Sequence, residues 1–213
     1  MWKEHKKTLI LASVVTLLPI LAGVYLWDRL PETMATHFGI DNAANGFCSK
    51  PVAVFGLPLF LLAVEWIAAI ATSHDPRRQN ISPKMFLIML WIAPVISVIG
   101  AAAIYSFNLG NGVDFSMFVP LLLGVLFIVI GNYMPKSRQN YTIGIKLPWT
   151  LANEENWNRT HRLGGYLWVI GGIVLVVLAL AGVGNPIWLL PVLAVMVLVP
   201  VVYSYWLHVK RGL

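Results

Sequence analysis

Residues 85–107 read MFLIMLWIAPVISVIGAAAIYSF and hold no charged side chain over the whole stretch. An α-helix rises 1.5 Å per residue, so these residues form a helix about 35 Å long. The hydrocarbon core of a bilayer is about 30 Å thick. The stretch is therefore predicted to cross a membrane as a single helix.

Five other stretches resemble it in length and composition, and they cover residues 8–27, 51–72, 115–134, 163–182 and 187–207. Hydrophobic residues make up 58% of the chain and charged residues 11%, whereas a soluble domain is about half apolar and about a quarter charged. The longest segment between spans, residues 135–162, is shorter than the ~40 residues that an unassisted domain needs. We expect an all-α polytopic membrane protein with six transmembrane helices, forming a single integral membrane domain over residues 1–213.

The basic residues are divided unequally between the connections. Of 15 Lys and Arg residues, all but Arg29 and Lys50 fall in the two tails, the 73–84 connection or the 135–162 segment and its borders. Cytoplasmic segments of membrane proteins retain Lys and Arg. We therefore expect cytoplasmic N- and C-termini, an extracytoplasmic loop at 28–50 and a cytoplasmic loop at 135–162. This distribution also accounts for the basic charge without nucleic-acid binding.

Two features of the loops and spans suggest specific roles. Asn153 is predicted to cap a helix near 153–164, with Glu154 and Glu155 in its first turn. This amphipathic helix is expected to lie at the headgroup boundary and to run into the fifth span. On it, one face combines Trp157, Thr160, His161 and Gly164. In the outer loop, Pro31 and a cluster of Gly and Asn residues predict turns rather than a long helix.

Glu65 is the one ionisable side chain inside a predicted span. An intramembrane carboxylate marks a functional site by default, which makes a small transporter or ion pathway through Glu65 an alternative function. The other interpretation is a structural pairing of Glu65 with a neighbouring helix. The sequence leaves both open.

The inner segment resembles a known family of membrane proteins. The run Asn140-Tyr-Thr-Ile-Gly-Ile-Lys-Leu-Pro-Trp-Thr-Leu151, followed by Trp157 and by Thr160-His161-Arg162, is similar to the inner-loop signature of the SdpI family. These are bacterial immunity proteins for the sporulation-delaying killing peptide. The outer-loop motifs Leu30-Pro31-Glu32, His37-Phe38 and Ser49-Lys50-Pro51 are similar to the extracytoplasmic motif of the family's N-terminal half.

The resemblance implies a function and candidate residues. A protein of this kind lies in the bacterial plasma membrane among lipids and protects the cell against a secreted toxin peptide. In one known relative it is also a receptor that holds a cytoplasmic transcriptional repressor at the membrane. The implied extracytoplasmic ligand-binding residues are Pro31, Glu32, His37, Phe38, Ser49 and Lys50. The implied cytoplasmic motif consists of Asn132, Pro135, Asn140, Gly144, Lys146, Pro148, Trp149, Thr150, Trp157, Thr160, His161 and Arg162.

Other chemistry finds little support in the sequence. The five histidines are never spaced at i, i+3 or i, i+4, and Cys48 is the single cysteine, so we expect no metal site. His37 and Asp41 give only a weak metal-binding signal. A membrane enzyme with His161 or His37 as base is a further alternative, but no nucleophile–base pair can be named. We expect no enzyme activity and no cofactor.

Overall fold

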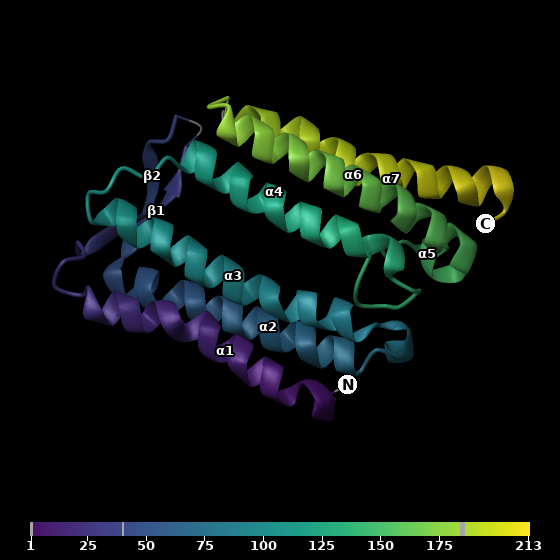
Figure 1. Ribbon diagram of the computed structural model, residues 1–213, viewed down its shortest axis with the longest axis horizontal. Coiled ribbons are helices and arrows are strands. Elements are labelled where there is room, and N and C mark those ends of the chain that lie inside the picture. Colours follow the sequence, from purple (N-terminus) through teal and green to yellow (C-terminus); the bar gives the residue numbers. More distant parts are fainter. Residues whose placement is uncertain (1, 40, 184–185) are drawn as a thin grey trace. The chain divides into compact units, whose positions relative to one another are not determined.

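The computed structural model describes residues 2–39, 41–183 and 186–213, and its chain is mainly helical (Figure 1). The main elements are α1 (Trp2–Tyr25), β1 (Thr33–Phe38), β2 (Ala44–Ser49), α2 (Leu57–Ser73), α3 (Pro83–Asn108), α4 (Phe115–Tyr133), α5 (Pro148–Ala152), α6 (Glu154–Leu180) and α7 (Leu189–Arg211). A π-helical turn at Val52–Gly56 leads into α2. Short 3-10 turns occupy Arg78–Asn80, Met134–Lys136 and Pro186–Trp188.

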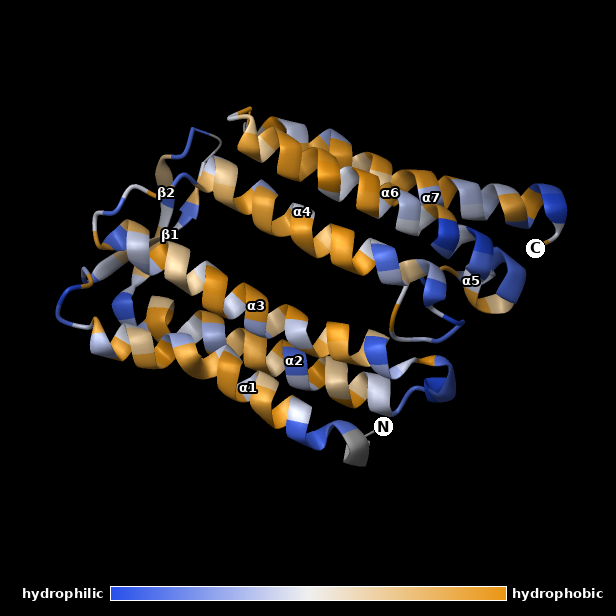
Figure 2. Ribbon diagram, viewed as in Figure 1, coloured by the Kyte–Doolittle hydropathy of each residue, from blue (hydrophilic) through white to orange (hydrophobic). Residues whose placement is uncertain are grey.

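Six of these helices are long and apolar enough to cross a membrane, which confirms the predicted number of spans. Figure 2 shows hydrophobic residues along each of them and hydrophilic residues mainly near their ends and in the connections. The fifth begins at Glu154 rather than near residue 163. The helix predicted near 153–164 is therefore no separate element but the first turns of α6.

The contacts divide the chain into two compact units. The first combines Met1–Ser73 with Leu87–Phe115, and the second combines His74–Phe86 with Ser116–Leu213. The expectation of a single domain stays a prediction.

In the first unit, the segment after α1, β1, the π-helical turn before α2 and the end of α3 form a small core. Its fully or nearly buried members are Leu30, Met34, Ala53, Val54, Ala101 and Tyr105. The Tyr105 hydroxyl donates a hydrogen bond to the Pro19 carbonyl of α1 at 3.2 Å. Gly23 lies against this core, where an added Cβ would meet Val54 at 2.6 Å. The helices therefore approach closely at this point.

The outer-loop segment forms an antiparallel β-hairpin, which the sequence analysis did not predict. Thr33 pairs with Ser49 and Met34 with Cys48, and the register shifts twice between Ala35 and Phe38. These irregularities interrupt the alternation that marks a strand in a sequence. The fold is helical with this one small sheet.

The hairpin is fastened to the end of α3. The Asn108 amide donates to the Ala35 carbonyl and accepts from the Ala35 N–H, both at 2.9 Å. Phe38 stacks on Phe115 with ring centroids 3.7 Å apart and meets Phe107 edge-on. The hairpin is therefore part of the first unit's packing rather than a loose loop.

In the second unit, α6 packs along α7 and also contacts α4. Two glycine pairs bring the backbones of α4 and α6 together. A Cβ added to Gly124 would lie 2.7 Å from the Gly172 carbonyl oxygen. A Cβ added to Gly131 would lie 2.9 Å from the Gly165 carbonyl oxygen. Small residues are the usual means of such close contact between membrane helices.

Candidate functional site

Lys50, a predicted ligand-binding residue, is buried at the base of the hairpin. Its side chain is 3% exposed, and its ammonium donates to the Trp27 carbonyl at 3.0 Å. The same nitrogen lies 2.9 Å from a Glu32 carboxylate oxygen and 5.1 Å from the centroid of the Trp27 ring. Lys50 therefore joins the end of β2 to the segment that follows α1.

The other predicted outer residues divide between surface and core. Pro31, Glu32, His37 and Ser49 are exposed, whereas Phe38 is partly buried by its aromatic neighbours. His37 Nδ1 lies 2.5 Å from the Asn45 amide oxygen across the hairpin. Along β2, exposed residues alternate with half-buried ones, so Asn45, Phe47 and Ser49 share one exposed face. We call His37 and these three residues the hairpin surface.

Phe47 is the large apolar side chain of the hairpin surface, and 59% of it is exposed. The sequence analysis did not select it. Its signal was available, because Phe47 stands among Asn, Gly and Ser residues in a polar loop.

Glu65 is buried in the first unit and contacts α1. Its carboxylate accepts hydrogen bonds from the Ser13 hydroxyl at 3.0 Å and from the Thr16 hydroxyl at 2.8 Å. Ser97 of α3 donates to the Thr16 carbonyl at 2.7 Å. Glu65 thus belongs to a polar contact between helices, and its role stays a prediction.

The predicted inner motif folds around Asn140, which is 1% exposed. Its amide oxygen accepts from the Thr142 and Ile143 N–H groups at 3.0 and 2.6 Å. Its amide nitrogen donates to the Arg138 and Ile143 carbonyls at 2.8 and 3.0 Å. One side chain therefore satisfies four backbone groups of the turn that contains it.

Gly144, Trp157 and His161 form the centre of the inner segment. The Trp157 and His161 rings stack with centroids 3.9 Å apart, and both side chains are fully buried. His161 Nε2 accepts from the Ile145 N–H at 2.9 Å, so Nδ1 carries the proton and donates to the Trp157 carbonyl at 2.8 Å. Trp157 Nε1 donates to the Ser137 carbonyl at 2.8 Å. These two rings fix the loop, and because both are buried they are not available to a binding partner.

Thr150 and Trp149 fasten the next part of the motif. The Thr150 hydroxyl accepts from the Leu147 N–H at 2.8 Å and lies 2.9 Å from the Ile145 carbonyl oxygen. Trp149 packs edge-on against Tyr205 and stacks on His208, both in α7. Pro148 begins α5, where its missing N–H costs nothing.

The remaining members of the predicted motif lie apart from this centre. Asn132, Pro135, Lys146 and Arg162 are exposed. Thr160 is buried and donates to the Asn156 amide at 3.1 Å.

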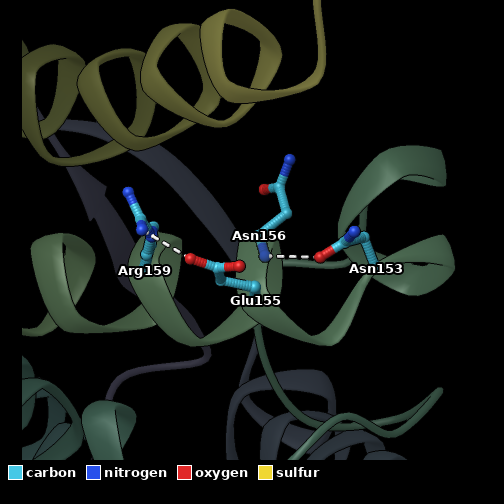
Figure 3. A network of polar contacts seen from close by, with 4 residues as sticks. All are labelled: Asn153, Glu155, Asn156 and Arg159. Atoms are coloured by element: carbon cyan, nitrogen blue, oxygen red, sulfur yellow. Dashed lines mark hydrogen bonds and ion pairs between the residues drawn. The ribbon is translucent and has the colours of Figure 1, made fainter. Parts of the chain in front are cut away.

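The start of α6 is held by residues that the sequence predicted and by one that it did not. The Asn153 side chain accepts from the Asn156 N–H at 3.0 Å, which confirms the predicted cap (Figure 3). Arg159 pairs with Glu155 one turn earlier, as the same view shows. The Asn156 amide, which the sequence analysis missed, also bonds to the Ser204 carbonyl and hydroxyl of α7.

Asp75 is the most informative residue that the sequence analysis overlooked. It is 3% exposed. Its carboxylate accepts from the Arg77 N–H at 2.7 Å, the Tyr141 N–H at 2.8 Å and the Thr142 hydroxyl at 2.9 Å. Its signal was that it is the one acidic residue in a basic connection.

Gln139 completes the connection between the 73–84 segment and the inner motif. Its amide oxygen accepts from Arg77, and its amide nitrogen donates to the Thr150 carbonyl at 2.7 Å. Asn80 donates to the Gln139 carbonyl at 2.7 Å. The inner segment is therefore a compact polar cap, in which the side chains of Asn140, Thr150 and His161 bond to backbone groups of the segment.

Metal chemistry has no geometric basis in the part of the chain described above. No group of three His, Cys, Asp or Glu side chains is placed there to hold an ion. The exposed groups instead offer surfaces: an apolar-polar hairpin in the first unit, and the cations of the inner segment in the second.

Comparisons with known proteins agree with the two loop motifs. Residues 136–204 match the model of the SdpI/YfhL protein family, and residues 14–62 match a domain of unknown function, DUF1648. The immunity protein SdpI of Bacillus subtilis (strain 168) is 25% identical over 174 residues, which cover 80% of each chain. No solved structure matches this chain. The run at 140–151 with Trp157 and residues 160–162 lies within the first match and the outer motif within the second, so the chain is similar to the SdpI/YfhL protein family over its inner segment.

Proposed function

We propose that this protein is a membrane immunity protein that protects a bacterial cell against a secreted, membrane-active peptide. The observation that carries the proposal is the hairpin surface, which presents exposed Phe47 beside His37 and Asn45 on a hairpin fastened to the helices. A rigid aromatic anchor among polar groups is a common feature of binding hot spots. The relationship to an immunity protein supports the same function.

The hairpin is also suited to a peptide ligand by its backbone. A two-stranded sheet has open edges, to which an extended peptide can add as a strand. Lys50 fastens the hairpin to the segment after α1, and Asn108 fastens it to α3. Binding therefore need not order the hairpin first, which reduces its entropic cost.

Survival of a sensitive bacterium under the purified sporulation-delaying killing peptide tests this function. Cells that express the protein should survive, and Phe47→Ser should lose most of the protection. Phe60→Ser is the matched control, because Phe60 is a similarly exposed phenylalanine on the surface of α2. Immunoblots of the membrane fraction establish equal amounts. Absence of protection while the protein is present in the membrane would refute the proposal.

A second part of the proposal concerns the inner segment. With the termini in the cytoplasm, the exposed cations Lys136, Arg138 and Lys146 face the cell interior and offer a surface for a soluble repressor. Such signalling requires two arrangements of the protein that the peptide binds unequally. Maleimide labelling of Cys48→Ser/Arg138→Cys should then change its rate when peptide is added. An unchanged rate under saturating peptide would leave the immunity function and remove the signalling one.

A further inference from the structure

Helices α6 and α7 carry a basic and aromatic hollow that the proposed function does not use. Its volume is about 600 Å³, and its lining consists of Arg159, Arg162, Leu163, Tyr166 and Tyr203. The α6 members recur at three- and four-residue spacing, which places them on one face of the helix. The hollow is therefore a feature of two packed helices rather than of one exposed side chain.

Arg162 is free to bind a ligand in this hollow. It is exposed and makes no hydrogen bond or ion pair with any residue that the structure describes. Arg159 pairs with Glu155 through one guanidinium nitrogen, and a guanidinium has five N–H donors. Tyr166 is 63% exposed, so its hydroxyl is available as well. The hollow thus offers two guanidinium groups and phenolic donors.

The surrounding charge favours an anion. Asn156 near the start of α6 bonds to α7 and to the Leu213 carbonyl, so the last turn of α7 lies at the same end. That turn holds His208, Lys210 and Arg211. Glu155 and the adjacent Glu154 are the opposing carboxylates. A phosphate suits two arginines, because its oxygens accept paired N–H bonds.

A separate apolar groove lies further along the same two helices. It has a volume of about 380 Å³ and is lined by Leu167, Ile170, Gly171, Val174, Leu178 and, from α7, residues between Trp188 and Met196. Ile170 follows Tyr166 by one helical turn, about 6 Å along the axis. From Leu167 to Leu178 the groove runs about 16 Å, which is close to half of the ~30 Å hydrocarbon core.

We propose that this face of α6 and α7 binds one anionic phospholipid, with its phosphate between Arg159 and Arg162 and an acyl chain in the groove. The phosphate of such a lipid matches the cationic hollow. Its acyl chain matches the apolar groove, which begins one helical turn away and is about as long as one leaflet is deep. A free phosphate would leave the groove unused, and a zwitterionic lipid such as phosphatidylcholine would bring its choline cation beside the arginines. The site lies wholly within the second unit and does not involve the hairpin surface.

Native mass spectrometry of the full-length protein in detergent tests the proposal. The protein is titrated with phosphatidylglycerol, phosphatidylcholine or glycerol phosphate. We expect phosphatidylglycerol to bind at least tenfold more tightly than either of the others. Arg159→Gln/Arg162→Gln should reduce this affinity at least tenfold, to the level of phosphatidylcholine. Arg138→Gln is the control, because Arg138 is an exposed arginine of the same unit outside the hollow.

A groove variant separates the two parts of the site. Val174 is 38% exposed in the groove wall, so Val174→Trp should fill the groove and weaken phosphatidylglycerol binding without removing a charge. Equal binding of the anionic and neutral lipids would overturn the proposal, as would an arginine double variant that binds like the natural chain. Equal binding of glycerol phosphate would show a phosphate site without a lipid chain. Thermal unfolding of each variant confirms that it is folded.

Discussion

Gly144 shows how closely the inner segment approaches α6. Its φ is +129°, a backbone conformation in which side chains are strained. An added Cβ would lie 2.4 Å from His161 Nε2 and 3.0 Å from the Trp157 ring. The glycine therefore allows Ile145 to donate its N–H to His161, and the stacked rings are positioned by that bond.

We predict that Gly144→Ala destabilises the second unit by more than backbone strain alone. Strain at such a position costs about 1–3 kcal/mol, and the collision with His161 adds to it. Gly110→Ala provides the comparison, since Gly110 also has positive φ but no atom within 4 Å of an added Cβ. Thermal unfolding in detergent should show a larger loss of Tm for Gly144→Ala. Equal losses would mean that the contact with His161 contributes nothing.

Near Glu65, two acceptors share the single hydrogen of the Thr16 hydroxyl. The Thr16 hydroxyl has a single hydrogen but lies 3.0 Å from the Ala12 carbonyl oxygen and 2.8 Å from Glu65 Oε2. A glutamine at position 65 would supply its own N–H to Thr16, so the hydroxyl could donate to Ala12. Its oxygen would still accept from Ser13.

Glu65→Gln should therefore keep the stability and the protective function of the protein, whereas Glu65→Leu should lose about 1–3 kcal/mol by leaving the Ser13 hydroxyl without its acceptor. Unfolding midpoints and peptide survival assays measure the two effects. A Glu65→Gln variant that folds normally but gives no protection would instead support an ion pathway through Glu65.

At the scale of elements, the hairpin depends on two asparagines that reach the ends of neighbouring segments. Asn108 bonds to both backbone groups of Ala35. Asn42 adopts a φ of 62° and accepts from the Phe115 N–H at 2.8 Å. Because these bonds replace water at the hairpin backbone, the hairpin keeps its orientation on α3.

Asn108→Ala should loosen the hairpin without unfolding the helices. Loss of the two hydrogen bonds to Ala35 removes about 1 kcal/mol each, so amide hydrogen exchange over residues 33–49 should become faster. Asn111→Ala is the control, since the exposed Asn111 side chain makes no hydrogen bond with a described residue. Unchanged exchange in Asn108→Ala would show that Phe38 and Lys50 hold the hairpin unaided.

The sequence predicted those elements whose signals are local. Long uncharged runs indicated the six helices, and Asn153 with two acidic neighbours indicated the start of α6. The hairpin escaped prediction because its register shifts twice. Asp75 escaped because its partners, Tyr141 and Thr142, are more than sixty residues away. Interactions between residues so far apart in the sequence form only in the folded chain, so the local spacing of residues does not indicate them.

For the whole molecule, the order of spans and loops sets the arrangement across a membrane. The loop that contains the hairpin follows the first span, and the inner segment follows the fourth, so we expect six spans to leave these two segments on opposite sides of the membrane. From the excess of Lys and Arg in one set of connections, we predict that the inner segment lies in the cytoplasm.

Labelling of intact cells with a membrane-impermeant maleimide should therefore modify Cys48, which is partly exposed in β2 and is the single cysteine of the chain. Cys48→Ser/Arg138→Cys should react only after the cells are opened. Modification of both positions in intact cells, or of neither, would contradict the proposed topology and the receptor mechanism that depends on it.

The bond between Asp75 and Tyr141 has a consequence for how the protein is made. Asp75 emerges from the ribosome 66 residues before its partner, a delay of roughly 3–13 s at 5–20 residues per second. During this interval α3 and α4 are synthesised, and the Asp75 carboxylate lacks the Tyr141 N–H group that later donates to it. The polar cap can thus close only when translation is well advanced, and closure of the cap marks a late step in the biogenesis of the second unit.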